Sequence, residues 1–318
     1  MTPGGTLLAA LLVTLSRPAT WPLALAAFLI RGGILVILLP IVVLPTTVGL
    51  GTAFGPTLRS VAFGSIPVEV IVAAASIGVG ALTWLVVGGW IAAGLEAAGA
   101  WIVAGDEEVA VAATSRASAG ARVPRPDGGV AIRILIARLV AAVPLAVALA
   151  LGSIRLVFVT YRELTAPLDV ATPIAIRVLR GSPEVVVAVV VTWMLAEIVG
   201  TLAARRIALA NAGVAPGLRH AVRVLIHEPV SSLARFWLPS LVLVVVLVPS
   251  ALAAASAWDA VGTVLNEGAE PLALLLTVVA FVGLWIVGLV LIGVVCGWRA
   301  AVWTVAEVAR GGDVRGVH

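Results

Sequence analysis

Two charged residues inside apolar stretches are the side chains most able to do chemistry in this sequence: Glu197, after TWMLA, and Arg31, after LALAAFLI. A carboxylate in hydrocarbon costs a few kcal/mol, so it faces protein or water, is paired, or is protonated. At ~1.5 Å per helical residue, Glu197 lies ~12 Å inside Arg205, and Arg31 lies ~13 Å deep if the first helix begins near Pro22 rather than after Arg31. We therefore predict an intramembrane polar site in which Arg31 pairs with Glu197. The alternatives are that Glu197 only joins helices and that Arg31 only ends an interfacial segment.

A third charge, Glu96, stands near the end of the apolar stretch LTWLVVGGWIAAGLEAAGAWIVAG. When the chain is aligned on its tryptophans, Glu96 falls opposite Arg205 and Arg299, which border their apolar runs. We therefore predict that Glu96 lies at a membrane edge, where water or a nearby arginine keeps it charged.

The other reactive side chains form no familiar catalytic or metal-binding motif. His220 and His227 are seven residues apart with Glu228 adjacent, but no further ligand cluster accompanies them. The single cysteine, Cys296, lies inside an apolar run, and the sequence has no phosphate loop, HExxH or nucleophile elbow. We predict no metal, no cofactor and no catalytic residue. The question of an enzyme stays open, with a non-enzymatic protein favoured over an intramembrane enzyme built around Glu197.

The composition indicates an integral membrane protein. Hydrophobic residues make up 62% of the chain and charged residues 11%, with a mean hydropathy of +1.18, whereas soluble domains have about 45–50% apolar and about 25% charged residues. All basic residues are arginines that flank apolar runs, where a membrane protein places them. Nucleic-acid binding is therefore not predicted despite the high isoelectric point.

Six runs poor in charge are long enough to be membrane spans, since about 20 apolar residues cross a hydrocarbon core of ~30 Å. The runs are 32–58, 70–95, 139–154, 185–204, 236–258 and 271–298. With no alternating pattern of barrel strands, the fold class is all-α with six transmembrane helices. Because Arg155 and Glu197 interrupt the third and fourth runs, a four-span protein with a re-entrant middle is the alternative.

Arginine placement predicts that both termini are cytoplasmic in the plasma (inner) membrane. Only five arginines fall on the other face of the six-span topology, and the remaining fifteen lie on the side of the termini. The five are Arg59, Arg155, Arg162, Arg177 and Arg180.

The six spans read as three repeated hairpins in a single membrane domain of residues 1–318. The hairpins are 1–103, 129–210 and 219–310, with a mobile cytoplasmic loop at 104–128. In each hairpin an arginine (Arg31, Arg138 or Arg235) precedes the first span after a short amphipathic stretch, which predicts an interfacial helix ahead of each hairpin.

Small and aromatic residues recur at corresponding places in the returning spans. Trp84, Trp193 and Trp285 align with one another, and Gly293 and Gly297 form a GxxxG pattern. We interpret all five as helix-packing residues, with a dimer face as the alternative for the glycines.

The six spans, together with the stretches TLSRP, VLRGSP and VLIHEP, resemble uncharacterised bacterial membrane proteins related to the membrane domain of glycerophosphodiester phosphodiesterase. The resemblance implies a bacterial inner-membrane protein with a role in envelope or lipid handling. No phosphodiesterase domain accompanies it, so that activity does not carry over.

These observations favour a non-enzymatic structural or accessory membrane component. The alternative is a transporter or permease subunit with Glu197 in the translocation path. The expected partners are membrane lipids, with another membrane protein or a second copy of the chain as further candidates.

Overall fold

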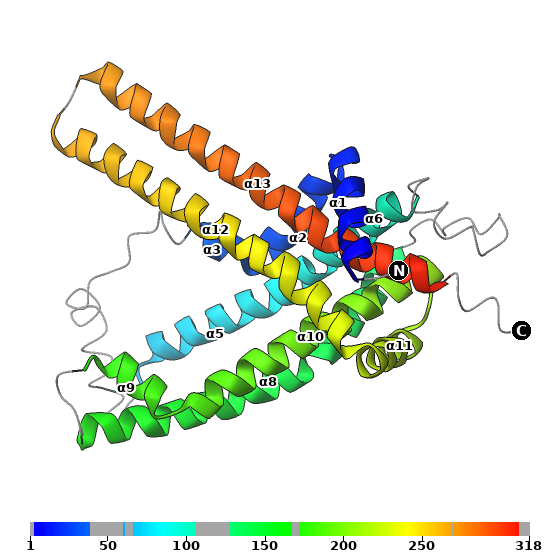
Figure 1. Cartoon of the computed structure of the whole chain (residues 1–318). Coiled ribbons are helices and arrows are strands. Elements are labelled where there is room, and N and C mark those ends of the chain that lie inside the picture. Colours follow the sequence, from blue (N-terminus) through cyan, green and yellow to red (C-terminus); the bar gives the residue numbers. More distant parts are fainter. Residues whose placement is uncertain are drawn as a thin grey trace, which may run out of the picture. The chain divides into compact units, whose positions relative to one another are not determined.

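The chain is helical throughout its described part. The computed structural model describes residues 3–38, 60, 66–105, 128–166, 172–268 and 270–311, and it has no strand among them (Figure 1). Apolar sequence favours this result, because in lipid the backbone polar groups must be bonded within their own segment. The predicted all-α class is confirmed for these residues.

Six helices in the described residues are long and apolar enough to cross a membrane. They are Thr20–Leu38, Val68–Ala104, Gly129–Glu163, Pro183–Ala210, Pro229–Asn266 and Pro271–Arg310. The third and fourth are 35 and 28 residues long, so the charges that interrupt them do not shorten them to re-entrant segments. Their number agrees with the six-span prediction.

The elements of Figure 1 have the following bounds, with η marking π-helical segments. They are α1 (Pro3–Ser16), α2 (Thr20–Phe28), η1 (Leu29–Gly33), α3 (Ile34–Leu38), α5 (Val68–Thr83), η2 (Trp84–Gly88), α6 (Gly89–Ala104), α8 (Gly128–Thr165), α9 (Ile174–Arg180), α10 (Pro183–Ala210), α11 (Val214–His227), α12 (Pro229–Asn266) and α13 (Pro271–Gly311).

Two boundaries differ from the prediction. The first apolar helix begins at Thr20 rather than at residue 32, and residues 39–58 of the predicted span lie outside the described part, as do 106–127 of the predicted loop. The segment GVAIRILIA, predicted as a separate interfacial helix, is instead continuous with the span that follows it in α8. No glycine-rich or proline turn separates the two, so the helix simply propagates.

The chain divides into two compact units. Unit 1 comprises Met1–Val13, Ala100–Leu238 and Ala301–His318, and unit 2 comprises Thr14–Gly99 and Pro239–Ala300. The second predicted hairpin lies in unit 1, whereas the third is divided between the units.

In unit 1, α8 and α10 pack along each other and α11 packs on α10. Small residues allow the close approach: a Cβ on Gly152 would meet Val185 at 2.7 Å, and one on Gly217 would meet Ile207 at 3.0 Å. The packed face of α10 includes Ile198, which is fully buried.

The C-terminus of α10 has its carbonyls satisfied by side chains from neighbouring helices. Asn211 ends the helix in the left-handed region at φ 51°, and its side-chain oxygen accepts a hydrogen bond from Arg133 Nη2 at 2.6 Å. The Trp101 indole donates to the carbonyl of Ala208 at 3.0 Å. Such donors replace the intrahelical partners that the last turn lacks.

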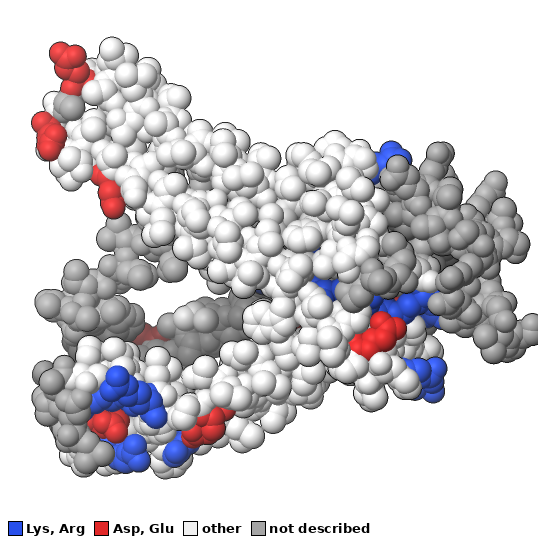
Figure 2. Space-filling view, viewed as in Figure 1, with Lys and Arg blue, Asp and Glu red and all other residues white. Residues whose placement is uncertain are grey.

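In unit 2, α12 and α13 pack with α2 and α3 around an apolar core of Ile37, Leu243, Ile292, Val295 and Cys296. In Figure 2 uncharged side chains cover these helices over most of their length, and acidic residues gather where α12 ends and α13 begins. The acidic residues there are Asp259, Glu267 and Glu270.

Candidate functional site: two buried arginine–glutamate pairs and a polar network

The first charged pair joins Arg31 to Glu96 within unit 2. Arg31 lies in η1, inside the first apolar helix, and its Nη2 donates to Oε2 of Glu96 on α6. Only 6% of the Glu96 side chain is exposed. A carboxylate buried to this degree stays ionised only beside a cation, which Arg31 supplies.

The backbone around this pair departs from regular α-helix on both sides. Arg31 lies in η1, and the second π-helical segment, η2, precedes α6. Gly32 has φ 104°, a conformation that side chains other than glycine's rarely adopt. The indole Nε1 of Trp84, at the start of η2, donates to the carbonyl of Ile30 at 2.8 Å, so the two interrupted segments are bonded to each other. Single π-turns inside helices often mark functional sites.

The second charged pair lies within unit 1, between α8 and α10. Arg138 Nη1 is 3.8 Å from Oε1 of Glu197, and Arg138 Nη2 donates to Oγ1 of Thr201 at 3.2 Å. Gly200 leaves room for this arginine, since a Cβ there would lie 3.4 Å from its Cγ. Glu197, Gly200 and Thr201 are spaced i, i+3 and i+4 and therefore share one helix face.

The structure gives Arg31 and Glu197 different partners from the ones predicted. Arg31 pairs with Glu96, and Glu197 lies beside Arg138, so the single predicted pair is replaced by two, one in each unit. The prediction treated Arg138 only as a residue that precedes a span and did not pair it with Glu197. Because Glu197 lies four residues before Thr201, a long arginine side chain reaches both. For Glu96 we predicted either contact with water or a nearby arginine, and the structure places Arg31 beside it.

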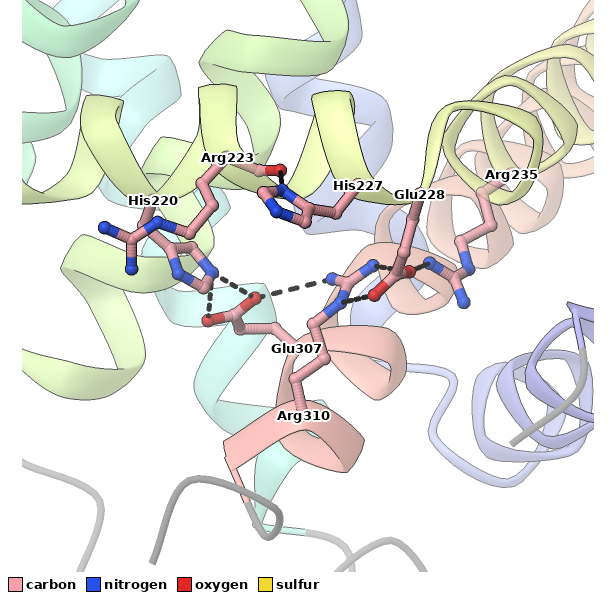
Figure 3. A network of polar contacts seen from close by, with 7 residues as sticks. All are labelled: His220, Arg223, His227, Glu228, Arg235, Glu307 and Arg310. Carbon is pink, nitrogen blue, oxygen red and sulfur yellow. Dashed lines mark hydrogen bonds and ion pairs between the residues drawn. The ribbon is translucent and has the colours of Figure 1, made fainter. Parts of the chain in front are cut away.

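A third group of charges lies in unit 1 around Glu307, near the end of α13 (Figure 3). Glu307 is 3% exposed. Its carboxylate is 3.1 Å from His220 Nε2, 3.5 Å from Arg206 Nη1 and 3.6 Å from Arg310 Nη1. The three side chains come from α11, α10 and α13, so one carboxylate holds three helices together.

Glu228, between α11 and α12, continues this network. It accepts a hydrogen bond from Arg310 Nη2 at 2.9 Å and lies 3.4 Å from Arg235 Nη1. The hydrogen bond from Arg310, more than the charges around it, lowers the pKa of Glu228 below its ordinary value against a smaller opposing effect of burial.

Sequence reasoning named Arg206, Arg235 and Arg310 as topology markers and missed Glu307. The spacing of Glu307 and Arg310, one helical turn apart inside a largely apolar segment, was a signal that could have found it. His220 was considered as a metal ligand, and the structure places it against Glu307, while Nδ1 of His227 donates to the carbonyl of Arg223 in its own helix. The described residues hold no group of three metal-ligating side chains.

The predicted packing residues lie at contacts within the chain. A Cβ on Gly297 would meet Thr14 at 3.2 Å, and one on Gly293 would meet the backbone of Trp21 at 3.5 Å. Trp193 packs edge-on against Phe236, and Trp285 stacks on Phe281. Trp84 differs, because its indole is a hydrogen-bond donor as described above.

Unit 2 also contains a pocket with an empty volume of about 290 Å³, lined by Ile37 together with residues of α12 and α13. Its lining is apolar apart from two groups: the hydroxyl of Ser250, which donates to the carbonyl of Val246 at 2.7 Å, and the indole N–H of Trp285, which is buried without a hydrogen-bond partner among the described residues. A pocket of this kind offers no charged group to a polar solute.

Comparison of the chain with protein-family models, with curated proteins and with solved structures finds no match.

Proposed function

We propose that this protein is a non-enzymatic structural or accessory component of a bacterial inner membrane, with both termini in the cytoplasm. One observation carries the proposal: Glu96 and Glu197, the carboxylates that apolar sequence surrounds most closely, are each held by an arginine of another helix. A paired carboxylate joins helices and is not free to bind a solute. Six apolar helices support the membrane location, and the arginine distribution supports the orientation.

The two pairs also support the three-hairpin organisation. Arg31 and Arg138 each lie in the first span of their hairpin, and each pairs with a glutamate that is followed three residues later by glycine: Glu96 with Gly99, and Glu197 with Gly200. In the third hairpin Arg235 pairs instead with Glu228. We infer that the arginine-to-glutamate contact is part of the repeating unit and that the third copy has exchanged it for the Glu228 network.

Native mass spectrometry of the protein extracted gently from its own membrane tests the accessory role. We expect a protein partner in fixed stoichiometry, together with retained phospholipid. A chain that emerges alone, or with lipid only, in several mild detergents would overturn the accessory role.

Transport is the second candidate, favoured specifically by η1 and η2. Non-α-helical backbone at membrane depth is tolerated where it lines a cavity or is buried in protein, and Gly32 could act as a hinge between the two parts of the first helix.

Proton flux into vesicles loaded with a pH-sensitive dye distinguishes the candidates. Flux above that of protein-free vesicles, abolished by Glu96→Gln or Glu197→Gln but kept in the control Glu69→Gln, would favour transport. Flux indistinguishable from protein-free vesicles would favour the structural role.

A further inference from the structure

Helix α11 has an outward face that unit 1 leaves uncovered. Its inner face, with Gly217, Ala221 and Val224 buried, packs against α10 and α8. On the opposite side Val222 is 44% exposed and Ile226 is 69% exposed. At 100° per residue these two lie one turn apart on the same stripe.

Basic side chains run beside this apolar stripe. Arg219 and Arg223 are exposed, and neither has an ion-pair partner among the residues that the structure describes. No acidic residue occurs between Val214 and His227. The outer surface of α11 therefore divides lengthwise into an apolar and a cationic half, and it is the most strongly amphipathic of the described helices.

The neighbouring elements place this surface beside the bilayer. Helix α12, one of the six apolar helices, begins at Pro229, two residues after α11 ends. Between them Glu228 is held by Arg310 and Arg235, and within α11 His220 contacts Glu307 (Figure 3). These contacts fix α11 to the ends of two spans, so it cannot move far from the membrane surface.

We propose that α11 docks on the anionic phospholipid headgroups of its own membrane, with Val222 and Ile226 inserted among the upper acyl carbons and Arg219 and Arg223 bound to lipid phosphates. An amphipathic helix with arginines beside an apolar stripe binds in this way. Arginine also extends its charged end to the headgroup layer while its methylenes stay in contact with apolar surface. This inference concerns lipid and does not depend on the accessory role.

Depth measurements on the full-length chain test the proposal. A nitroxide attached at Ile226→Cys, in a Cys296→Ala background, reports its relative accessibility to oxygen and to a water-soluble nickel chelate. The protein is reconstituted into bilayers of phosphatidylcholine alone or mixed with phosphatidylglycerol. We expect oxygen to be favoured in the anionic bilayer, because a docked label lies below the headgroups.

Removal of the arginines should weaken docking only in the anionic bilayer. Each basic residue near such a surface is worth about fivefold in binding, so Arg223→Gln should lower the ratio of docked to undocked helix about fivefold and Arg219→Gln/Arg223→Gln about 25-fold. Arg180→Gln is the matched control, since Arg180 is exposed on another helix and has no ion pair in the described part of the chain.

Two results would overturn the proposal. One is a label equally accessible to the nickel chelate in both bilayers, which would place α11 in water or against a protein. The other is a label that lies deep in both bilayers and is unaffected by the double substitution, which would show apolar insertion without headgroup recognition.

Discussion

The two arginine–glutamate pairs in apolar helices have the same residue types but differ in the conformation of the helix that carries the arginine. Arg31 meets Glu96 from a segment that is kinked at Gly32, whereas Arg138 meets Glu197 between two regular α-helices. The exposed fraction of the glutamate side chain is 6% in the first pair and 28% in the second. In the first pair the guanidinium donates directly to the carboxylate, and in the second it donates to Thr201 and lies 3.8 Å from Glu197.

The difference shows how the local backbone sets the cost of breaking a pair. A carboxylate buried this deeply is shielded from water, so loss of the nearby arginine is costly, and loss of the carboxylate leaves the charge of Arg31 without its ion pair. Glu197 is less enclosed and lies farther from its arginine, and Thr201 still accepts a hydrogen bond from that arginine when Glu197 is replaced. The first pair should therefore be a structural requirement of unit 2, and the second a weaker contact between α8 and α10.

The largest effect is expected from Glu96→Gln. It leaves the charge of Arg31 unpaired beside a buried amide, and breaking such a pair costs roughly 3–5 kcal/mol. The midpoint of unfolding in mixed micelles, measured by circular dichroism, should fall accordingly. Glu69→Gln is the control because Glu69 is exposed at the start of α5. Equal midpoints for the two variants would show that the pair contributes nothing.

A double substitution sharpens this prediction. Replacing Arg31 by Met together with Glu96 by Leu removes both charges and keeps apolar volume, which is often neutral for a buried ion pair. We expect the double variant to recover most of the stability that Glu96→Gln loses. Failure to recover it would mean that the interrupted backbone of η1 requires the arginine itself.

A smaller effect is expected from Glu197→Gln. The carboxylate is 3.8 Å from Arg138, a longer contact than that of the first pair, and a polar contact between membrane helices is worth about 0.6 kcal/mol. The same unfolding measurement should give a loss well below that of Glu96→Gln. A loss as large as that of Glu96→Gln would contradict the comparison and would revive Glu197 as a site under functional constraint.

The sequence predicted the class of the fold because its signal is strong and local. Apolar runs of sufficient length require helices in lipid, and six were found both in the sequence and in the described residues. The sequence indicated less clearly where a helix is interrupted. Nothing in LAAFLIRGGILV distinguishes a helix that starts after Arg31 from one that runs through it with a π-turn, since Gly32 and Gly33 suit either a boundary or an interruption.

Charge pairing was harder to predict because it depends on the register between helices. Aligning the tryptophans placed Glu197 opposite Gly88, which hid its similarity to Glu96. The two pairs indicate a register in which Glu96 and Glu197 correspond, with a glycine three residues after each. The length of the arginine side chain was also neglected. Depth was counted from the rise per residue along the helix axis, although the guanidinium of Arg138 extends to Thr201 on α10.

Trp84→Phe tests the bond between the two interrupted segments. It removes the donor to the carbonyl of Ile30, and a hydrogen bond between membrane helices is worth about 0.6 kcal/mol. Trp193→Phe is the matched control, because Trp193 is similarly exposed and contacts Phe236 through its ring rather than through a hydrogen bond. Trp84→Phe should lower the unfolding midpoint more than Trp193→Phe, and the reverse order would show that the indole contributes only by packing.

The smallest effect concerns Glu228, which lies outside the spans and is 41% exposed. Because the pKa of Glu228 is lowered in the folded protein, its stabilising contribution is present above the ordinary glutamate pKa of about 4.3. It is lost as the pH falls through the lower folded value. Solvent screening limits this stabilising contribution to about a few tenths of a kcal/mol.

The unfolding midpoints of the wild type and Glu228→Gln should therefore differ slightly at neutral pH and converge as the solution is acidified below pH ~4. A difference that persists in acid would mean that Glu228 acts through packing, unlike Glu96 and Glu197, whose contributions are expected to depend on charge.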